Sequence, residues 1–263
     1  MYADSQNDIT RLVVRCAQLL LAYGAESDLV EEISQRLGKA LGLASIELSI
    51  SSNALVLTSL VHGRCITTTR RIRAHGINMM VICELQRICL LTEKGIYGAN
   101  EVRRRLAHIK PKSYPALAVV PMIGLSCASF CHLFDGDLIA SIITFFASSI
   151  GMMVRLFLAS RHFNLLVNFS LTAFVITAVA QMGYLWPITQ TPQATMAASV
   201  LMLVPGFPLI NAISDMVKGH MNVGISRWGH ATLLTLASVI GITIAMQMGG
   251  IFLDVIFFKF TAT

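Results

Sequence analysis

The chain has 263 residues, of which 55% are hydrophobic and only 13% are charged. An average soluble domain is about half apolar and about a quarter charged, so the shortage of charge is the stronger signal. These values exclude an intrinsically disordered protein, a collagen-like fibre and a disulfide-rich secreted scaffold. The mean hydropathy of +0.68 indicates that part of the chain lies in a membrane.

The charges are concentrated in the first part of the chain. Residues 1–113 hold 15 of the 20 Lys and Arg residues and 10 of the 14 Asp and Glu residues. We therefore expect a cytoplasmic soluble domain over residues 1–113 and a transmembrane domain over residues 114–263. The net charge of +6 does not indicate a nucleic-acid partner, because the basic residues gather where a membrane protein keeps its cytoplasmic charge.

The period of the hydrophobic residues changes twice within the N-terminal region. Helical spacing, then alternation, then helical spacing again predict an α+β domain with the order ααβββαα. Gly24 is a natural break between the first two helices, although the pattern also allows one long helix. The expected helices and strands cover residues 7–41 (helical), 46–50, 54–61 and 64–72 (strands), and 77–91 and 99–109 (helices).

Five apolar segments follow, and each is close to the ~20 residues that cross a bilayer as a helix. The sequence therefore predicts an α-helical polytopic membrane protein with five transmembrane helices and an N-terminal α+β soluble domain. The segments cover residues 116–134, 138–159, 165–186, 194–213 and 230–257.

Basic residues alternate between the two sides of the expected membrane domain. Arg155 and Arg161 lie around the connection after the second segment, and Lys218 and Arg227 lie in the connection after the fourth. The connections after the first and third segments hold no Lys or Arg. By the positive-inside rule the N-terminus is expected in the cytoplasm and the C-terminus outside it.

No residue pattern in the chain indicates an enzyme. The sequence contains no GxSxG, HExxH, Walker A or GxGxxG motif. Its six cysteines fit no disulfide or zinc framework and are typical of structural thiols in a reducing compartment. We therefore expect no catalytic residues, no metal site and no cofactor.

The strongest local signal in the membrane region is Pro205-Gly206-Phe207-Pro208. Two prolines around a glycine remove backbone donors and interrupt a helix at membrane depth. Interrupted helices of this kind line the substrate sites of many transporters, where a half-helix N-terminus can hold an anionic group. The alternative is a kink that serves packing alone.

Polar residues near this break supply a candidate site. We expect Pro205, Gly206, Pro208 and Asn211 to bind a substrate carboxylate. Asp215 lies one helical turn after Asn211 on the same face, which makes it a candidate proton-coupling residue, and the alternative is a carboxylate at the cytoplasmic end of the span.

Arg155 in the second segment is a possible counter-ion for the substrate. Alternatively, the Arg155 side chain snorkels to the cytoplasmic surface of the membrane.

Several motifs distributed over nearly the whole chain resemble the threonine/serine exporter (ThrE) family, and most closely its YjjP subgroup. The last motif is the most specific. The motifs are Gly24-Ala25-Glu26-Ser27, Ser51-Ser52-Asn53-Ala54, His75-Gly76-Ile77-Asn78, Gly124-Leu125-Ser126-Cys127, Ile143-Thr144-Phe145-Phe146-Ala147-Ser148 and Leu203-Val204-Pro205-Gly206-Phe207-Pro208-Leu209-Ile210-Asn211.

This resemblance implies an exporter of small hydrophilic metabolites in the bacterial inner membrane. Fused members carry five further spans, whereas this chain resembles the larger half of a split exporter whose second subunit is the small membrane protein YjjB. The split pair is associated with succinate and the fused members with threonine and serine, so the resemblance favours succinate and leaves the amino acids open. A homo-oligomer is possible in addition.

Two other kinds of function remain open at this point. The chain could be a regulatory or scaffold subunit of a separate permease, because its span count is odd and a second half is missing. It could also be a membrane-bound enzyme, against which the absence of a nucleophile–base pair and of metal ligands weighs.

Overall fold

A computed structural model describes residues 2–61, 63–73, 76–185 and 189–261, so His75 of the third motif lies outside the described residues. The chain forms two compact units. The first unit contains residues 1–113 together with 207–229, and the second contains residues 114–206 together with 230–263. The segment 207–229, which lies between the last two apolar segments of the sequence, thus folds with the N-terminal region.

The first unit has the element order that the hydrophobic periods predict. The helices and strands of residues 1–113 are α1 (Tyr2–Ala22), α2 (Ser27–Ala40), β1 (Ser45–Ile50), β2 (Ala54–Val61), β3 (Arg64–Arg71), α3 (Met79–Glu93) and α4 (Ala99–His108). The prediction of a region that combines helices with three antiparallel strands is therefore confirmed. The same unit also receives most of α10 (Gly206–Val217) and the first turns of α11 (Met221–Thr261).

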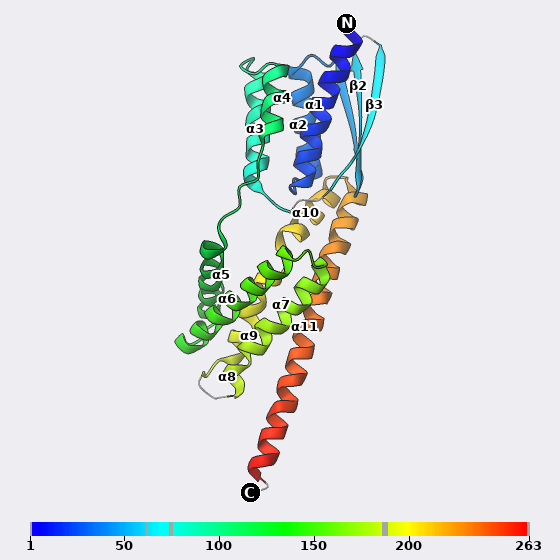
Figure 1. Ribbon diagram of the computed structural model, residues 1–263. Coiled ribbons are helices and arrows are strands. Elements are labelled where there is room, and N and C mark those ends of the chain that lie inside the picture. The colour runs from blue at the N-terminus through cyan, green and yellow to red at the C-terminus, as the bar shows by residue number, and fades with distance from the viewer. Residues whose placement is uncertain (1, 62, 74–75, 186–188, 262–263) are drawn as a thin grey trace. The chain divides into compact units, whose positions relative to one another are not determined.

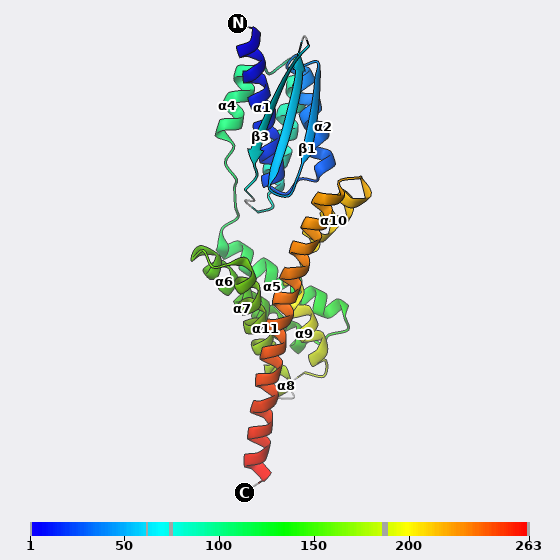
Figure 2. The ribbon, with the colours of Figure 1, turned by 90° about the vertical axis from the view of Figure 1, so that its right-hand side faces the viewer.

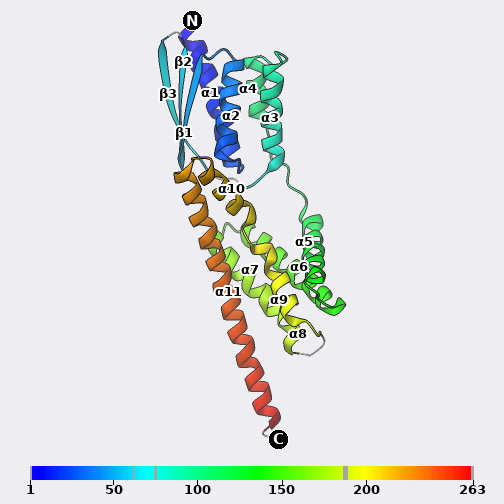
Figure 3. The same ribbon diagram turned by 180° about the vertical axis from the view of Figure 1, so that it is seen from behind.

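Residues 1–113 are arranged in three layers. The sheet forms one outer layer, α1 and α2 form the middle layer, and α3 and α4 form the other outer layer (Figures 1 and 3). Because both sides of α1 are covered, its second half is apolar almost all the way round, and Val13, Cys16, Ala17 and Leu20 have no exposed surface. Burial in this layer raises the pKa of the Cys16 thiol, which keeps it protonated.

The sheet has one buried and one open face. Its strands run antiparallel in the order β1-β2-β3, and Leu55 and Leu57 on β2 are fully buried. Figure 2 shows the sheet from its outer face, with α1 and α2 behind it. On that outer face the Thr58 and Thr67 hydroxyls are 2.9 Å apart and hydrogen-bonded. The period-2 alternation of apolar and polar residues accounts for both faces.

A sharp backbone turn separates α1 from α2. Gly24 has φ +89°, and the Ala25 amide donates to the Leu20 carbonyl at 2.9 Å, as in a Schellman-type helix end. A side chain at residue 24 would be strained there and would also meet Ile77. The structure therefore has two helices rather than the one long helix that the sequence also allowed.

The second unit is entirely helical among its described residues. It contains α5 (Ala116–Leu133), α6 (Leu138–Ser160), α7 (Leu165–Ala180), α8 (Met182–Leu185), α9 (Pro192–Val200), the 3₁₀ turn η1 (Leu201–Leu203) and the remainder of α11. Helix α6 contacts α5, α7 and α9. Gly241 of α11 faces the Ser170 carbonyl of α7 so closely that a side chain would not fit, which is typical of tight helix contacts in membranes.

Three helices in the described chain are long and apolar enough to cross a membrane. They are α5, α6 and the Met221–Gly250 part of α11, and the bent pair formed by α9–η1 and α10 is a fourth candidate. Helix α7 is apolar but has only 16 residues, because the predicted third segment divides at Gln181 into α7 and α8. The chain is thus a helical membrane protein with three or four candidate spans.

Candidate functional sites

The helix interruption at Pro205 is present and short. The turn η1 ends at Leu203, Val204 has extended backbone angles (φ −66°, ψ 120°), and α10 begins at Gly206. The Gly206 amide bonds to the Val204 carbonyl at 2.8 Å. Pro205 has no N–H to continue the helix, which explains the break.

The helix interruption covers fewer residues than the sequence suggested. Pro205 is buried, but Gly206 opens α10 and Pro208 lies in its first turn, where a missing N–H is tolerated. Pro205 and Gly206 belong to the second unit, whereas Pro208 and Asn211 belong to the first. The sequence predicted one site from these residues. Because they belong to different units, we describe two sites, one in each unit.

The site in the second unit is centred on Arg155 of α6. Its guanidinium carbon lies 4.6 Å from the centre of the Phe169 ring of α7. One of its nitrogens, Nη1, lies 3.5 Å from the carbonyl oxygen of Met202, in the last turn before the break. The side chain is half-buried, and no carboxylate pairs with it among the residues that the structure describes. Within the described parts of the chain, the Arg155 guanidinium therefore has only the Phe169 ring and one weak carbonyl contact.

Neighbouring polar groups hold the backbone around Arg155. The amide of Asn168 on α7 donates to the Arg155 carbonyl at 3.1 Å, and the Thr172 hydroxyl donates to the Asn168 side-chain oxygen at 3.2 Å. Asn168 and Thr172 are both buried. They fix α7 against α6 through interhelical hydrogen bonds, which leaves the Arg155 guanidinium available.

A row of hydroxyl groups on α6 leads toward Arg155. We call Ser141, Thr144 and Ser148 the hydroxyl row, since helical spacing puts them on the same face as Arg155. Thr144 and Ser148 are fully buried. The Ser148 hydroxyl donates to the Ser199 carbonyl of α9 at 3.2 Å, whereas the Ser141 and Thr144 hydroxyls have no hydrogen-bond partner within the described residues. Unsatisfied buried hydroxyls are costly and are candidates for contacts with a polar ligand or water.

The opposite end of α6 carries a second polar cluster, which the sequence did not reveal. Asp137 caps α6 by accepting from the Ala140 amide at 2.8 Å, and it also accepts from the Thr189 hydroxyl at 2.7 Å. The Thr189 hydroxyl is the main influence that holds the pKa of Asp137 below its ordinary value. This cluster holds the start of α6 against residues 189–191. The hydrogen bonds of Asp137 thus serve the structure of this end of α6.

The site in the first unit joins α10 and α11 to residues 24–27, the turn between α1 and α2. We call this contact the latch. The Asn211 amide donates to the Gly24 carbonyl at 2.9 Å, and Arg227 of α11 donates to the Ala25 carbonyl at 2.9 Å. The most specific sequence motif, which contains Asn211, thus contacts the first motif of the chain, 187 residues earlier.

Asp215 lies at the centre of the latch with no exposed surface. One of its carboxylate oxygens accepts from the Ser27 amide at 2.9 Å, and the other lies 2.8 Å from Nη1 of Arg227. The second contact is an ion pair without hydrogen-bond alignment. Glu26, the N-cap residue of α2, does not cap with its own side chain, so Asp215 supplies the negative group at the N-terminus of that helix.

A more exposed ion pair flanks the latch. The Glu26 carboxylate accepts from Lys218 Nζ at 2.8 Å and from the Ser214 hydroxyl at 3.0 Å. The hydrogen bond from Lys218 is the largest influence that lowers the pKa of Glu26, and the hydrogen bond to Glu26 is the largest that raises the pKa of Lys218. Each pKa moves in the direction that favours the charged pair.

These two shifts predict how the stability of the first unit depends on pH. A lowered Glu26 pKa adds stability that is present above its ordinary value of 4.5 and is lost as pH falls through the folded value. A raised Lys218 pKa adds stability that is present below 10.5 and is lost at higher pH. The difference in melting temperature between the parent and Glu26→Gln should therefore be constant near neutral pH and shrink below pH 4.5.

Glu47→Gln is the matched control for this measurement, because Glu47 is exposed on β1 and has no ion-pair partner among the described residues. The difference in melting temperature between Glu47→Gln and the parent should stay small at every pH. It should not shrink below pH 4.5 as the difference for Glu26→Gln does. Equal curves for Glu26→Gln and the parent at every pH would contradict the assigned role of the pair.

These features together define a helical integral membrane protein with a cation beside an interrupted helix, and the described residues contain no cluster of three metal-ligating side chains. Residues 11–249 match the family model described as "Putative threonine/serine exporter". The chain belongs to the ThrE family. Since that family consists of exporters, the expectation of a transport protein rather than an enzyme is confirmed.

Three relatives place the chain within the family. It is 49% identical to the "Probable succinate transporter subunit YjjP" of Klebsiella aerogenes and 48% identical to the protein of that name in Escherichia coli K12. Each alignment covers 95% of this chain and 98% of the relative. The "Probable threonine/serine exporter" of Mycobacterium tuberculosis is 24% identical over 90% of this chain but only 45% of its own length. No solved structure matches the chain.

Proposed function

We propose that the chain is one subunit of a bacterial inner-membrane transporter that exports succinate together with a YjjB-like second subunit. The observation that carries this proposal is Arg155, a half-buried cation with no carboxylate partner among the described residues, beside the break at Pro205. An unpaired cation within a membrane helix is costly unless an anion visits it. Two relatives of nearly equal length are named as succinate transporter subunits, which supports the choice of a dicarboxylate.

Within this proposal Arg155 is the counter-ion for one substrate carboxylate. Guanidinium and carboxylate groups match in a two-pronged hydrogen-bonded pair, which favours arginine for this role. The hydroxyl row on the same face of α6 offers neutral donors along a path of about 21 Å between Ser141 and Arg155, from the helical rise of about 1.5 Å per residue. Pro205 and Gly206, which belong to the same unit as Arg155, shape the break.

We propose that Asp215 couples transport to protons through the latch. Protonation of Asp215 would remove the charge that Arg227 pairs with and would weaken the contact with residues 24–27. Asn211 contributes to substrate binding indirectly, because its amide is already bonded to Gly24 and helps to hold α10 in place.

The proposed topology has five spans with a cytoplasmic N-terminus and a periplasmic C-terminus. Residues on both sides of the segment 114–206 belong to the same compact unit, so an even number of crossings between them is the simplest arrangement. Crossings by α5, α6, α7 and the bent pair that begins with α9 satisfy this condition, and α11 then ends on the opposite side. Two crossings by α5 and α6 alone would give the same positions for both ends of the chain.

Reconstitution in proteoliposomes tests the proposed function. Labelled succinate and labelled threonine are offered to liposomes that contain this chain, the YjjB-like subunit, or both. We expect saturable succinate transport only with both subunits, because the M. tuberculosis relative extends well beyond the region that this chain matches.

The other outcomes of this experiment decide against the proposal. Threonine transport by the pair would assign the amino acids instead of succinate. Full-rate transport by this chain alone would remove the need for a second subunit, and transport by the partner alone would leave this chain a regulatory or scaffold role.

A further inference from the structure

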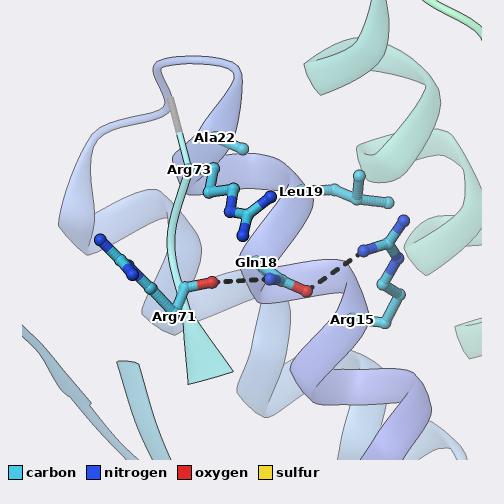
Figure 4. Close-up of a pocket in the computed structure, with 6 residues that line it drawn as sticks. All are labelled: Arg15, Gln18, Leu19, Ala22, Arg71 and Arg73. Atoms are coloured by element: carbon cyan, nitrogen blue, oxygen red, sulfur yellow. Dashed lines mark hydrogen bonds between the residues drawn. The ribbon is translucent and has the colours of Figure 1, made fainter. Parts of the chain in front are cut away.

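A cavity of about 310 Å³ in the first unit is lined by three arginines and no acidic residue. It lies between α1 and the segment that follows β3, and its lining residues are Arg15, Gln18, Leu19, Ala22, Arg71 and Arg73 (Figure 4). We call it the arginine pocket. Its volume is at the lower end of the range for small-molecule sites, which is about 300–1,000 Å³.

The pocket is built on a fixed frame. Arg15, Gln18 and Leu19 share one face of α1 through helical spacing, and Leu19 is buried beneath the pocket. The Gln18 amide donates to the Arg71 carbonyl at 2.7 Å and accepts from Arg15 Nη1 at 3.2 Å. Gln18 therefore holds the end of β3 against α1 and orients the Arg15 guanidinium.

The three arginines surround Gln18 from different sides. In Figure 4 the Arg73 side chain reaches over Gln18, Arg15 lies beside it on α1, and the Arg71 side chain extends to the other side. Arg15 and Arg73 are thus placed to share one ligand, and Arg71 flanks the pocket. All three side chains are exposed, so a ligand can reach them from water.

The positive charge of the pocket is not compensated within the described residues. No carboxylate forms an ion pair with Arg15, Arg71 or Arg73 there, whereas Arg103 and Arg36, which line other cavities of this unit, are paired. Arg103 lies 3.0 Å from Asp8, and Arg36 lies 2.7 Å from Glu93. Like charges that gather without a counter-ion repel one another, and a bound anion would relieve that repulsion.

We propose that the arginine pocket binds a small soluble dianion that carries two carboxylates or a phosphate group. Arginine pairs with both groups through the same two-pronged geometry, and the volume admits a small metabolite. The site is separate from Arg155, which belongs to the other compact unit, and so it stands independently of the proposed transport function.

Titration calorimetry on the full chain in neutral detergent tests this proposal. Succinate and inorganic phosphate are titrated separately, and butyrate serves as a monoanion of similar size to succinate. We expect at least one dianion to bind saturably and butyrate to bind much more weakly. Arg15→Gln and Arg73→Gln should each weaken that binding about tenfold or more, and Arg71→Gln should weaken it less.

Two control variants show whether dianion binding depends on the arginine pocket in particular. Arg64→Gln removes the same charge from the opposite end of β3 without touching the pocket, and it should bind the dianion like the parent. Arg155→Gln is measured beside it and reports on any succinate binding in the second unit, to which Arg155 belongs. Circular dichroism spectra show whether the pocket variants remain folded.

Several outcomes would overturn the proposal. The simplest of these outcomes is that neither dianion binds saturably to the parent. Equal weakening by Arg64→Gln would mean that only net charge matters, and loss in Arg155→Gln alone would place the binding in the second unit. Loss of dianion binding on transfer to nanodiscs with anionic lipid, but not with neutral lipid, would identify a lipid headgroup as the occupant.

Discussion

Replacing Arg155 by glutamine should lower succinate transport by the reconstituted pair by about 10- to 100-fold. A charge-assisted hydrogen-bonded contact is worth roughly 1.5–3 kcal/mol, which corresponds to that range. Arg155→Lys should give an intermediate rate, because lysine keeps the charge but loses the planar fork that matches a carboxylate. Initial rates of labelled succinate uptake at equal protein levels provide the measurement.

The stability of the same variant gives a second, independent test. Removing one partner of a structural ion pair destabilises a membrane protein, but Arg155 has no carboxylate partner among the described residues. Arg155→Gln should therefore melt at or above the temperature of the parent while it loses transport. A structural role would give the reverse result, with a lower melting temperature.

Arg161→Gln is the matched control for Arg155→Gln. Arg161 follows the last turn of α6, is exposed, and has its guanidinium carbon 5.4 Å from the Phe157 ring. The reconstituted pair with Arg161→Gln should transport succinate at the rate of the parent. If Arg155→Gln also transports like the parent, Arg155 is a snorkelling surface charge and the substrate site lies elsewhere.

The helices and strands of this chain could be predicted from its sequence because each depends on the spacing of apolar residues that are close together in the chain. Alternation over residues 46–50 and 54–61 predicts strands, and the observed strands cover Ser45–Ile50 and Ala54–Val61. The break at Pro205 was predictable for the same reason, since proline lacks the N–H that a helix requires.

Contacts between distant segments could not be predicted in this way. Nothing in the local sequence of Asp215 shows that it meets the Ser27 amide, 188 residues earlier. Hydropathy assigned Asn211 to a span, but it could not show that the Asn211 amide bonds to the Gly24 carbonyl. The signal in the sequence was that Asn211 and residues 24–27 both belong to family motifs.

The arginine pocket was missed for a related reason. In the sequence Arg71 and Arg73 lie in a basic run that is typical of solvated charge. Only folding brings that run to Arg15 on α1, 56 residues before Arg71, and only the ion pairs of the structure show which arginines lack a partner.

Replacing Asp215 by asparagine should destabilise the first unit by about 3–5 kcal/mol, the usual effect of removing one partner from a buried ion pair. Arg227 would be left without its carboxylate, and the Ser27 amide would lose the negative group at the start of α2. Thermal or denaturant unfolding in detergent measures this loss. Asp28→Asn is the control, because Asp28 is exposed and pairs with Lys218 at 3.3 Å, so its effect should be about 0–1 kcal/mol.

The double variant Asp215→Asn with Arg227→Gln separates the structural role of Asp215 from its proposed role in proton coupling. Removing both charges abolishes the uncompensated arginine and should recover much of the lost stability. In this restored background, proton-driven succinate export should remain abolished while succinate exchange persists, because exchange needs no proton-accepting carboxylate. Asn211→Ala should instead weaken apparent substrate affinity by loosening α10. If the stable double variant exports at the parent rate under a proton gradient, Asp215 holds the latch together and does not couple transport to protons.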